Sequence, residues 1–216
     1  MLNSRLLACA GYVQGNFICD VGTDHAFLPI YLVQNGIAEK AVAGDIRKGP
    51  LQSAVQNITK AGLQDKIRTV LSDGLQNVPP DGLTDIIIAG MGGETIIHIL
   101  ETCPFSLKNS NLIFQPMTKA ELLRKWLYEH GFEIQDETCV PDKKFLYAVM
   151  QVQYSGICRT PDAPEIYFGK MNLKHPDCRA YAAHAVSQLK KANFQANPEL
   201  SGIISKLEEI LQCAFS

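Results

Sequence analysis

The chain has 216 residues, 46% of them hydrophobic, and its formal net charge is -2 with a sequence pI near 6.2. This length allows one large domain, or a main domain of roughly 150 residues with an appendage. The charge balance gives no whole-chain signature of nucleic-acid binding, so an RNA or DNA partner would require a local basic patch.

The seven cysteines are an odd number and none forms a CxxC pair, so the sequence indicates neither a disulfide framework nor a zinc site. The first residues lack a signal-peptide pattern, and no apolar run approaches the roughly 18 residues that a membrane span needs. We therefore expect a soluble, cytoplasmic protein without a metal site.

Short apolar runs alternate with amphipathic segments from about residue 1 to 155. The runs are NFICDVG, AVAGDI, IRTVLSDG, TDIIIAGMGG, NLIFQPM, EIQDETCV and FLYAVMQVQY. Strands that alternate with helices predict βαβ units and a mostly parallel sheet, whereas the short PDKK turn between the last two runs predicts an antiparallel hairpin. Residues 1–155 are therefore predicted to form a doubly wound, Rossmann-like α/β domain.

The pattern changes after residue 155. Residues 177–195 and 199–214 carry two helical patterns separated by Asn197 and Pro198, which predicts a coiled-coil-like antiparallel helical hairpin within a C-terminal helical domain, residues 156–216. The apolar stripe of these helices can pack within the hairpin or against a second subunit. We expect a monomer or a weak homodimer.

Acidic and glycine residues follow the first four predicted strands. Ligands of open α/β sheets bind beyond the carboxyl ends of the strands, at the topological switch point, so residues at these positions are the candidates for a binding site. They are Asp20, Gly22, Asp24 and His25 after the first strand, Asp45 and Ile46 after the second, Asp73 and Gly74 after the third, and Ala89, Gly90, Met91, Gly92 and Gly93 after the fourth.

The spacing of these acids suits a nucleoside. Asp45 lies 23 residues after Gly22, near the spacing of about 20 expected for a carboxylate that accepts hydrogen bonds from both ribose hydroxyls. Asp73 can accept a hydrogen bond from the exocyclic amine of adenine, and Ile46 can cover the face of the ring. These features alone fit NAD and S-adenosylmethionine equally well.

The first loop favours S-adenosylmethionine. A pyrophosphate requires a GxGxxG loop, but Gly22 is followed by Thr-Asp-His-Ala, and a carboxylate there would repel it. The ammonium and sulfonium groups of S-adenosylmethionine are instead attracted by Asp20 and Asp24. A nicotinamide oxidoreductase remains an alternative. Each acid also has a structural interpretation, as a helix cap for Asp20, Asp24 and Asp45 or as a turn residue for Asp73.

Several segments, taken in order, resemble one family. LNSRLLACAGYV, ICDVGTDHAFLPIYL, AVAGDI, SDGL, DIIIAGMGGETI and IFQPM, followed by a helical tail, are similar to the bacterial tRNA (adenine(22)-N(1))-methyltransferases over essentially the whole chain. The resemblance implies a class I methyltransferase fold, S-adenosylmethionine as cofactor, a C-terminal helical extension and methylation of N1 of adenine 22 of tRNA. Other adenine methyltransferases carry a (D/N)PP(Y/F) loop where this chain has AGMGG, so the resemblance leaves its catalytic residues open.

The candidate catalytic residues are Asp24, Met91, Gly92 and Gln115, which the predicted topology places around the same pocket. N1 of adenine carries a lone pair, so methyl transfer needs alignment more than deprotonation. Asp24, or alternatively Glu94, can stabilise the positive charge that develops on the base. We interpret His98 and the other histidines beyond His25 as structural or surface residues.

The candidate RNA-binding residues are Arg5, Lys170, Lys174, Arg179 and Lys190. They would contact phosphates and recognise tRNA by its shape more than by its sequence. Two further alternatives stay open. One is a methyltransferase for a small molecule or protein, and the other is a non-catalytic module that binds S-adenosylmethionine or RNA.

Overall fold

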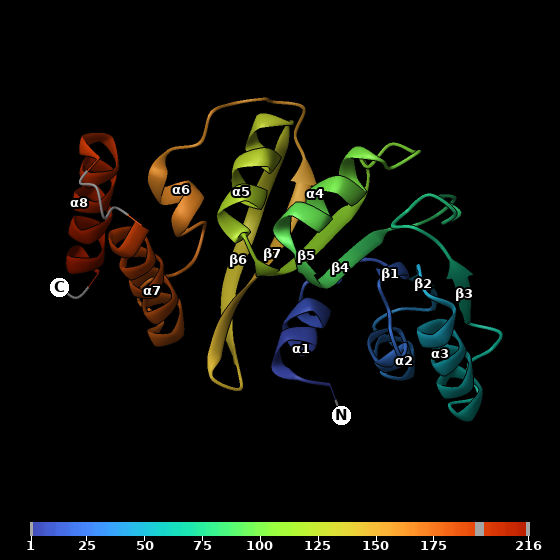
Figure 1. The fold of residues 1–216 in the computed structure, drawn as a ribbon. Helices are drawn as coiled ribbons and strands as arrows, with labels where there is room; N and C mark the ends of the chain where they lie inside the picture. The colour runs from blue at the N-terminus through green and yellow to red at the C-terminus, as the bar shows by residue number, and fades with distance from the viewer. Residues whose placement is uncertain (1, 193–196, 215–216) are drawn as a thin grey trace.

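The computed structural model describes residues 2–192 and 197–214. Helices flank both faces of a single seven-stranded sheet, and a group of three further helices extends beyond one end of it (Figure 1). The strands are β1 (Phe17–Val21), β2 (Lys40–Asp45), β3 (Ile67–Leu71), β4 (Asp85–Gly92), β5 (Asn111–Thr118), β6 (Phe132–Asp142) and β7 (Phe145–Tyr154). The helices are α1 (Ser4–Gly11), α2 (Phe27–Gln34), α3 (Lys48–Lys60), α4 (Gly93–Glu101), α5 (Ala120–Glu129), α6 (Ala163–Tyr167), α7 (Pro176–Ala192) and α8 (Pro198–Cys213).

The strand order is β3-β2-β1-β4-β5-β7-β6. Strands β1 to β5 are parallel, whereas β7 is antiparallel to both β5 and β6. The doubly wound sheet and its antiparallel hairpin are therefore confirmed. The order reverses between β1 and β4, so the switch point, where such sheets bind ligands, lies between these two strands.

The central strand β4 explains why helices cover both faces of the sheet. Side chains alternate between the faces of a strand, and Ile86, Ile87 and Ile88 are all fully buried. Ile87 packs in a core with residues of α1, α2 and α3, while Ile86 and Ile88 pack in a second core with residues of α4 and α5. A continuous apolar run is therefore what this buried parallel strand requires.

The C-terminal segment forms the predicted helical hairpin. A separate small core joins α6, α7 and α8, built from Phe168, Ala182, Val186, Ile204, Leu207 and Leu211. The first predicted helix extends to residue 195, but α7 is described only to Ala192, and residues 193–196 lie outside the described residues. Helix α6 is absent from the sequence prediction, although Asp162 and Glu165 form a capping box at its start.

The main core does not end at residue 155. Met171 and Cys178 are buried in the same core as β6 and β7, whereas Phe168 and Ala182 belong to the small core, so residues 168–182 contribute to both cores. A buried ion pair strengthens this junction: Arg124 Nη2 of α5 lies 2.7 Å from Glu137 Oε1 of β6, with both side chains at most 1% exposed.

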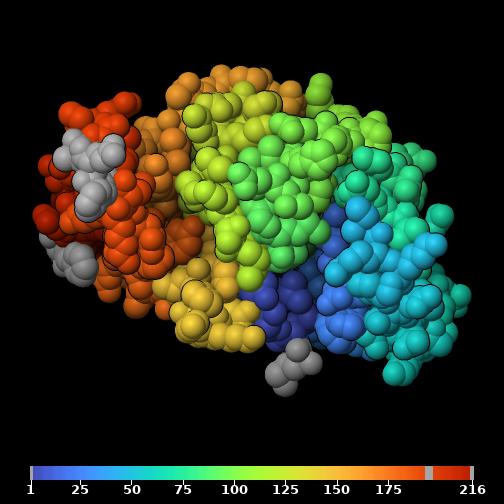
Figure 2. Space-filling model, viewed as in Figure 1, coloured from blue at the N-terminus to red at the C-terminus, as the bar shows by residue number. Residues whose placement is uncertain are grey.

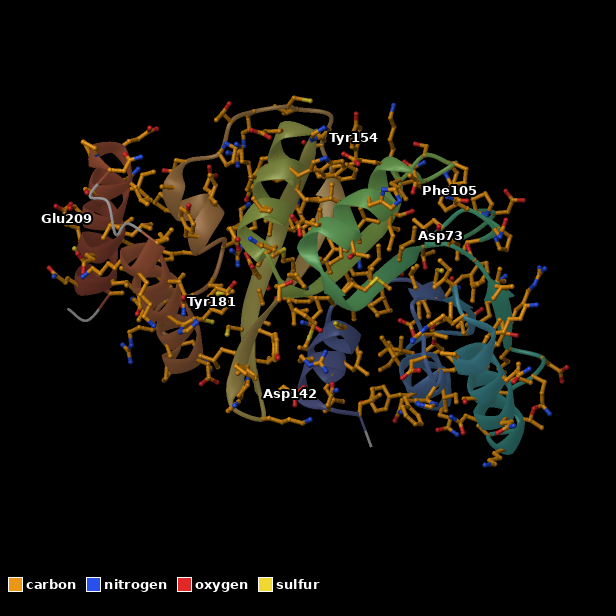
Figure 3. The ribbon with its side chains drawn as sticks, viewed as in Figure 1. Asp73, Phe105, Asp142, Tyr154, Tyr181 and Glu209 are labelled. Atoms are coloured by element: carbon orange, nitrogen blue, oxygen red, sulfur yellow. The ribbon has the colours of Figure 1, made fainter. Side chains whose placement is uncertain are left out.

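The C-terminal segment provides further hydrogen-bond partners for both members of this ion pair. Arg124 also donates to the carbonyl oxygen of Ile166 at 2.9 Å and to the hydroxyl of Tyr181, which Figure 3 labels on α7, at 3.3 Å. Glu137 accepts from the backbone N–H of Lys170 at 3.2 Å. The helical segment is thus fixed to the sheet by charged hydrogen bonds as well as by apolar packing.

Candidate functional site

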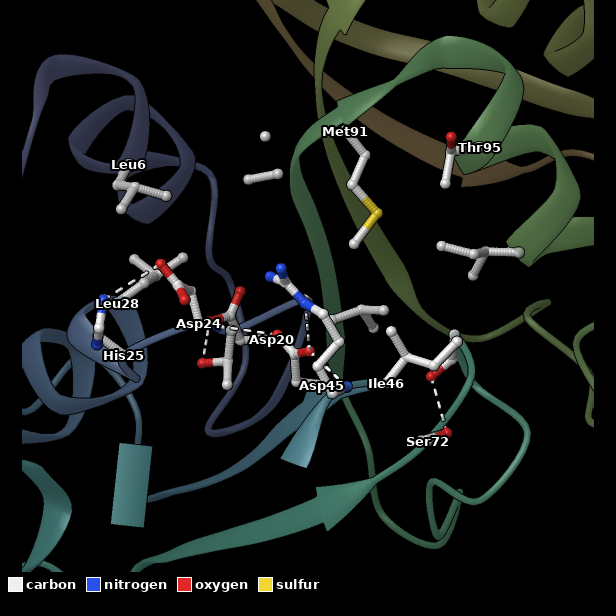
Figure 4. Close-up of a pocket in the computed structure, with 18 of the residues that line it drawn as sticks. Leu6, Asp20, Asp24, His25, Leu28, Asp45, Ile46, Ser72, Met91 and Thr95 are labelled. Carbon is white, nitrogen blue, oxygen red and sulfur yellow. Dashed lines mark hydrogen bonds and ion pairs between the residues drawn. The ribbon is translucent and has the colours of Figure 1, made fainter. Parts of the chain in front are cut away.

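A cavity of about 580 Å³ opens at the carboxyl ends of the parallel strands, beside the switch point. Its walls come from α1, from the loops after β1 to β4 and from the first turns of α4 (Figure 4). All of the residues predicted to bind the cofactor line it, namely Asp20, Gly22, Asp24, His25, Asp45, Ile46, Asp73, Gly74, Ala89 and Gly90. The volume lies within the roughly 300–1,000 Å³ typical of small-molecule sites.

Asp20 forms the buried base of the first loop. Its side chain accepts a hydrogen bond from Thr23 Oγ1 at 2.7 Å, and the residue is only 5% exposed. Burial raises the pKa of this carboxyl to about 6, and the nearby charge of Asp45 acts in the same direction, while the Thr23 hydrogen bond opposes both. A cationic ligand group would stabilise the ionised form that burial disfavours.

Asp24 occupies the exposed rim of the same loop. Its backbone φ is 52°, and that of Ala26 is 58°, a left-handed conformation that non-glycine residues rarely adopt and that is often found at functional sites. The Asp24 carboxylate lies 3.4 Å from His25 Nε2. Because α2 begins at Phe27 with Ala26 as its N-cap and no side-chain cap, the alternative in which Asp20 or Asp24 caps this helix is wrong.

Asp45 links two loops of the cavity wall. One carboxylate oxygen accepts from the Arg47 N–H at 2.9 Å, the other accepts from the Asp24 N–H at 3.3 Å, and the residue is 4% exposed. An ionised carboxylate has about four acceptor positions, so two remain for a ligand. The N-cap of α3 is Arg47, so Asp45 does not occupy the N-cap position. Ile46 is exposed beside it, at 59%.

The loop after β3 is held by Ser72, which the sequence analysis missed. Ser72 is buried, its hydroxyl donates to the carbonyl oxygen of Gly74 at 2.9 Å, and it accepts from the Asn77 N–H at 3.0 Å. These bonds fix a turn that leaves the neighbouring Asp73 exposed at the cavity. The turn interpretation of Asp73 and the ligand interpretation are therefore compatible.

The AGMGG loop closes the opposite side of the cavity. Strand β4 shifts register against β5 around Met91, and Gly90 adopts a φ of 79°, so the strand bulges beside the site. Met91 and Thr95 face Asp20, Asp24 and Asp45 across the pocket in Figure 4. Gly22 adopts a φ of 75°, which favours glycine, and the flexible end of Met91 packs directly against it.

Two of the four candidate catalytic residues do not line the cavity. Gln115 is fully buried, and its Oε1 accepts from Arg5 Nη1 at 2.7 Å and from the Gly90 N–H at 3.2 Å. Gly92 lies next to Thr118 behind the loop. Gln115 therefore contacts Arg5 and the β4 bulge and does not line the cavity, and its catalytic role stays a prediction.

Arg5, predicted to bind RNA, lines the cavity as well. Its Nε lies 2.6 Å from Asp142 Oδ2, and its guanidinium lies 5.3 Å from the centre of the Tyr147 ring. These contacts join α1 to the β6–β7 hairpin beside the pocket.

The other predicted RNA-binding residues are on the C-terminal segment, which Figure 1 places at the far end of the sheet from α2 and α3. Lys170 is paired with Glu133 at 3.0 Å and Lys190 with Glu208 at 2.5 Å. Lys174 is exposed and Arg179 is partly buried. None of these four residues lines the cavity.

Thr95 and His98 of α4 also line the cavity, and the interpretation of His98 as structural or surface is incomplete. The two residues are three positions apart and therefore share a helix face, which is the signal that the sequence contained. Among residues 2–192 and 197–214, no group of three or more histidine, cysteine or acidic side chains is arranged to hold a metal ion.

The wall of the cavity carries four carboxylates, of which Asp20 and Asp45 are buried and Asp24 and Asp73 are exposed. This electrostatic character suits a ligand that combines positive charge with hydroxyl and amine donors, and it opposes a pyrophosphate.

Along the described chain, none of the helices has both the length and the apolar character needed to cross a membrane.

Comparison with known proteins identifies the family of the chain. Residues 2–150 match a family described as a methyltransferase domain. The chain is 39% identical over 152 residues to the tRNA (adenine(22)-N(1))-methyltransferase of Bacillus subtilis, an alignment that spans 69% of this chain but only 63% of the relative. The chain thus matches less than two thirds of that curated protein's length.

Solved structures cover nearly the whole chain. M. capricolum TrmK in complex with S-adenosyl-homocysteine has a TM-score of 0.83 and 32% identity, with 98% of each chain covered. Streptococcus pneumoniae Sp1610 in complex with S-adenosyl-L-methionine has a TM-score of 0.86 and 35% identity, covering 98% of this chain and 100% of that one. Together with the strand order and the acidic cavity, these matches show that the chain belongs to the class I methyltransferases, in the family of the bacterial tRNA (adenine(22)-N(1))-methyltransferases.

Proposed function

We propose that this protein is an enzyme that transfers a methyl group from S-adenosylmethionine to N1 of adenine 22 of tRNA. The observation that carries the proposal is the cavity at the switch point, in which the buried carboxylates Asp20 and Asp45 lie beside each other in a chain of this family. The acidic wall fits the ammonium, the sulfonium, the ribose hydroxyls and the adenine amine of the cofactor.

In this proposal the loops after β1, β2, β3 and β4 each contact a different part of the cofactor. Asp20 and Asp24 bind its positively charged methionine end, and Gly22 allows the chain to turn closely around it. Asp45 accepts hydrogen bonds from the ribose hydroxyls through the acceptor positions that the Arg47 and Asp24 amides leave open. Asp73 and Ile46 contact the adenine, the first at its amine and the second at its face. Ala89 and Gly90 line the opposite wall.

S-adenosylmethionine supplies an electrophilic methyl group on a sulfonium. N1 of the substrate adenine donates its lone pair to that methyl carbon, and the C–S bond breaks, so no proton has to be removed from the base. The protein contributes mainly alignment, and the Asp24 carboxylate stabilises the positive charge that appears on the methylated ring. Met91 packs beside the reacting groups, and Gln115 keeps Arg5 and Gly90 in place.

N1 lies on the Watson–Crick edge of adenine, so a paired or stacked base must leave the helix before it can enter the cavity. The partner is tRNA, and the protein works in the cytoplasm as a monomer or weak homodimer. Residues 1–155 supply cofactor binding and chemistry, and residues 156–216 form the helical domain.

The test is incorporation of labelled methyl from S-adenosylmethionine into unmodified tRNA, with the product identified by mass spectrometry. We expect 1-methyladenosine at position 22, and no incorporation into a tRNA that carries guanine at this position. If folded protein binds S-adenosylmethionine but leaves tRNA unlabelled, then a small-molecule or protein acceptor, or a non-catalytic role, replaces this proposal. Screening such acceptors with the same labelled donor separates the two.

A further inference from the structure

The β6–β7 hairpin extends past its last pair with β5. The last pair between β5 and β7 is Phe114 with Met150, whereas β6 and β7 remain paired as far as Asp142 with Phe145. Beyond that last pair the hairpin continues for five residues of β7, roughly 17 Å at the rise of an extended strand, while β5 continues to Thr118 paired with β4 alone. Because β7 is antiparallel to β5, this extension projects from the carboxyl edge of the sheet, the edge that carries the cavity.

Helix α1 fixes this extension beside the cavity. Arg5, which lines the cavity, binds Asp142 at 2.6 Å, and the Ser4 hydroxyl donates to the carbonyl oxygen of Pro141. In Figure 2 the yellow atoms of the hairpin end lie against the dark blue atoms of α1. The end of the hairpin is therefore held at a defined position next to the site.

We call residues Lys143, Lys144 and Phe145 the hairpin tip. All three are exposed, Phe145 at 54%, and Lys144 Nζ lies 5.3 Å from the centre of the Phe145 ring. Asp142, the only acid adjacent to them in sequence, is neutralised by Arg5. Within the described part of the chain, neither lysine takes part in an ion pair.

Most lysines with a defined partner in the C-terminal segment show the opposite arrangement, although the exposed Lys174 takes part in no ion pair among the described residues. Lys170, Lys190 and Lys206 are each paired with a carboxylate, at 3.0, 2.5 and 3.2 Å. A chain with a net charge of -2 attracts RNA only through local positive charge. Lys143 and Lys144 of the hairpin tip carry positive charge that no carboxylate of the described residues neutralises, and they lie next to the cavity.

We propose that the hairpin tip binds the RNA strand that flanks the methylated adenine, with Lys143 and Lys144 contacting phosphates and a neighbouring base stacking on Phe145. This inference rests on the proposed function, since it takes the partner to be RNA. Lysines combined with an exposed aromatic ring are the features that bind unpaired nucleotides irrespective of sequence. An adenine that has left its helix exposes the stacking faces of the nucleotides on either side of it, together with their phosphates.

The test is binding of fluorescent, unmodified tRNA, followed by anisotropy at several salt concentrations in the presence of S-adenosylhomocysteine, which prevents turnover. We use Lys143→Gly/Lys144→Gln, because Lys143 has a φ of 55° that glycine adopts without strain, so this change removes charge without disturbing the turn. The dependence of log affinity on log salt should become shallower by about 1.4 to 1.8, the value for two lost phosphate contacts. Phe145→Ala should weaken binding about tenfold.

The matched control is Lys60→Gln/Lys66→Gln, which removes the same charge at the end of α3 and just before β3, at the amino edge of the sheet. It should leave tRNA affinity and its salt dependence unchanged, and S-adenosylhomocysteine affinity should be unchanged in all variants. Equal tRNA binding by the tip variants and the wild type would overturn the inference. So would loss of affinity in Lys190→Gln/Lys191→Gln but not in the tip variants. These readouts need no methylation, so failure of the proposed function is detected separately by the labelling assay.

Discussion

The cavity contains two buried carboxylates, Asp20 and Asp45, and the C-terminal junction contains one, Glu137. Of these three, Glu137 is the one that lies within 3 Å of a positively charged side chain in the described structure. Glu137 lies 2.7 Å from Arg124, and backbone groups of the C-terminal segment complete both ends of the pair. Asp20 accepts a hydrogen bond from the neutral Thr23 hydroxyl and has no ion pair among the described residues. Asp45 accepts two backbone N–H groups, and the Arg47 side chain, 71% exposed, lies 3.7 Å away.

This difference indicates that the charge of Glu137 stabilises the fold, whereas the charges of Asp20 and Asp45 are suited to binding a ligand. A buried carboxylate without a close cation is unfavourable in the free protein, and it becomes favourable when a positive ligand arrives. Changes at the junction should therefore alter the free energy of unfolding, and changes in the cavity should alter ligand affinity.

The largest effect is expected at the junction. Arg124→Met leaves Glu137 buried without its partner, which should lower the free energy of unfolding by about 3 to 5 kcal/mol. Urea denaturation followed by circular dichroism measures this change. The double variant Arg124→Met/Glu137→Gln removes both charges and should recover most of the loss. If the single and double variants are equally unstable, the cost comes from lost packing and the ion pair is not its source.

Asp45 should produce the next largest effect, on ligand affinity. Asp45→Ala removes the carboxylate proposed to bind both ribose hydroxyls, and hydrogen bonds to charged groups contribute roughly 1.5 to 3 kcal/mol each, so cofactor affinity should fall by about 100-fold or more. Isothermal titration with S-adenosylmethionine measures this, and tRNA binding should change by less than about twofold. Equal losses of both in a folded variant would contradict the ribose assignment.

Asp20 should make both stability and cofactor affinity depend on pH, in opposite directions. Its pKa is about 6 in the folded protein against an ordinary value of 3.8, so the folded state binds more protons between these values. The free energy of unfolding of the free protein should therefore fall as pH rises from about 4 to 6. Binding a positive ligand requires the ionised form, so cofactor affinity should instead decrease up to about tenfold per pH unit below 6.

The check is titration of S-adenosylmethionine into the wild type and Asp20→Asn between pH 5 and 7.5, with thermal unfolding at the same values. The asparagine variant should bind weakly and lose most of the pH dependence in this range. If its affinity still falls below pH 6 as steeply as in the wild type, another group is responsible.

The sequence was sufficient to predict the sheet and the loops of the cavity, because in parallel strands both depend on local patterns. Ile86 to Ile88 identify a buried strand, and topology then brings the residues after successive strands together. Helix α6 was signalled by Asp162 and Glu165 but missed, since it has only five residues and no hydrophobic period to reveal it.

The remaining errors concern contacts between residues far apart in the chain. Gln115 comes at the end of a strand beside the site, yet its side chain turns to Arg5, 110 positions earlier. The sequence also did not predict that Arg124 of α5 pairs with Glu137 of β6. It did not predict that Arg124 donates a hydrogen bond to the Ile166 carbonyl oxygen either. Such partners depend on the three-dimensional packing of segments, for which a single sequence contains no periodic signal.

The smallest effect should come from the exposed ion pairs of the C-terminal segment, which sharpen the contrast with Arg124. Lys206 lies 3.2 Å from Asp162, but both side chains are more than half exposed. Lys206→Gln should therefore lower the free energy of unfolding by less than about 1 kcal/mol, and less at high salt, because solvent screens the pair. Urea denaturation at low and high salt measures both values. A loss as large as that of Arg124→Met would mean that an exposed ion pair within the helical segment contributes as much to stability as the buried pair does.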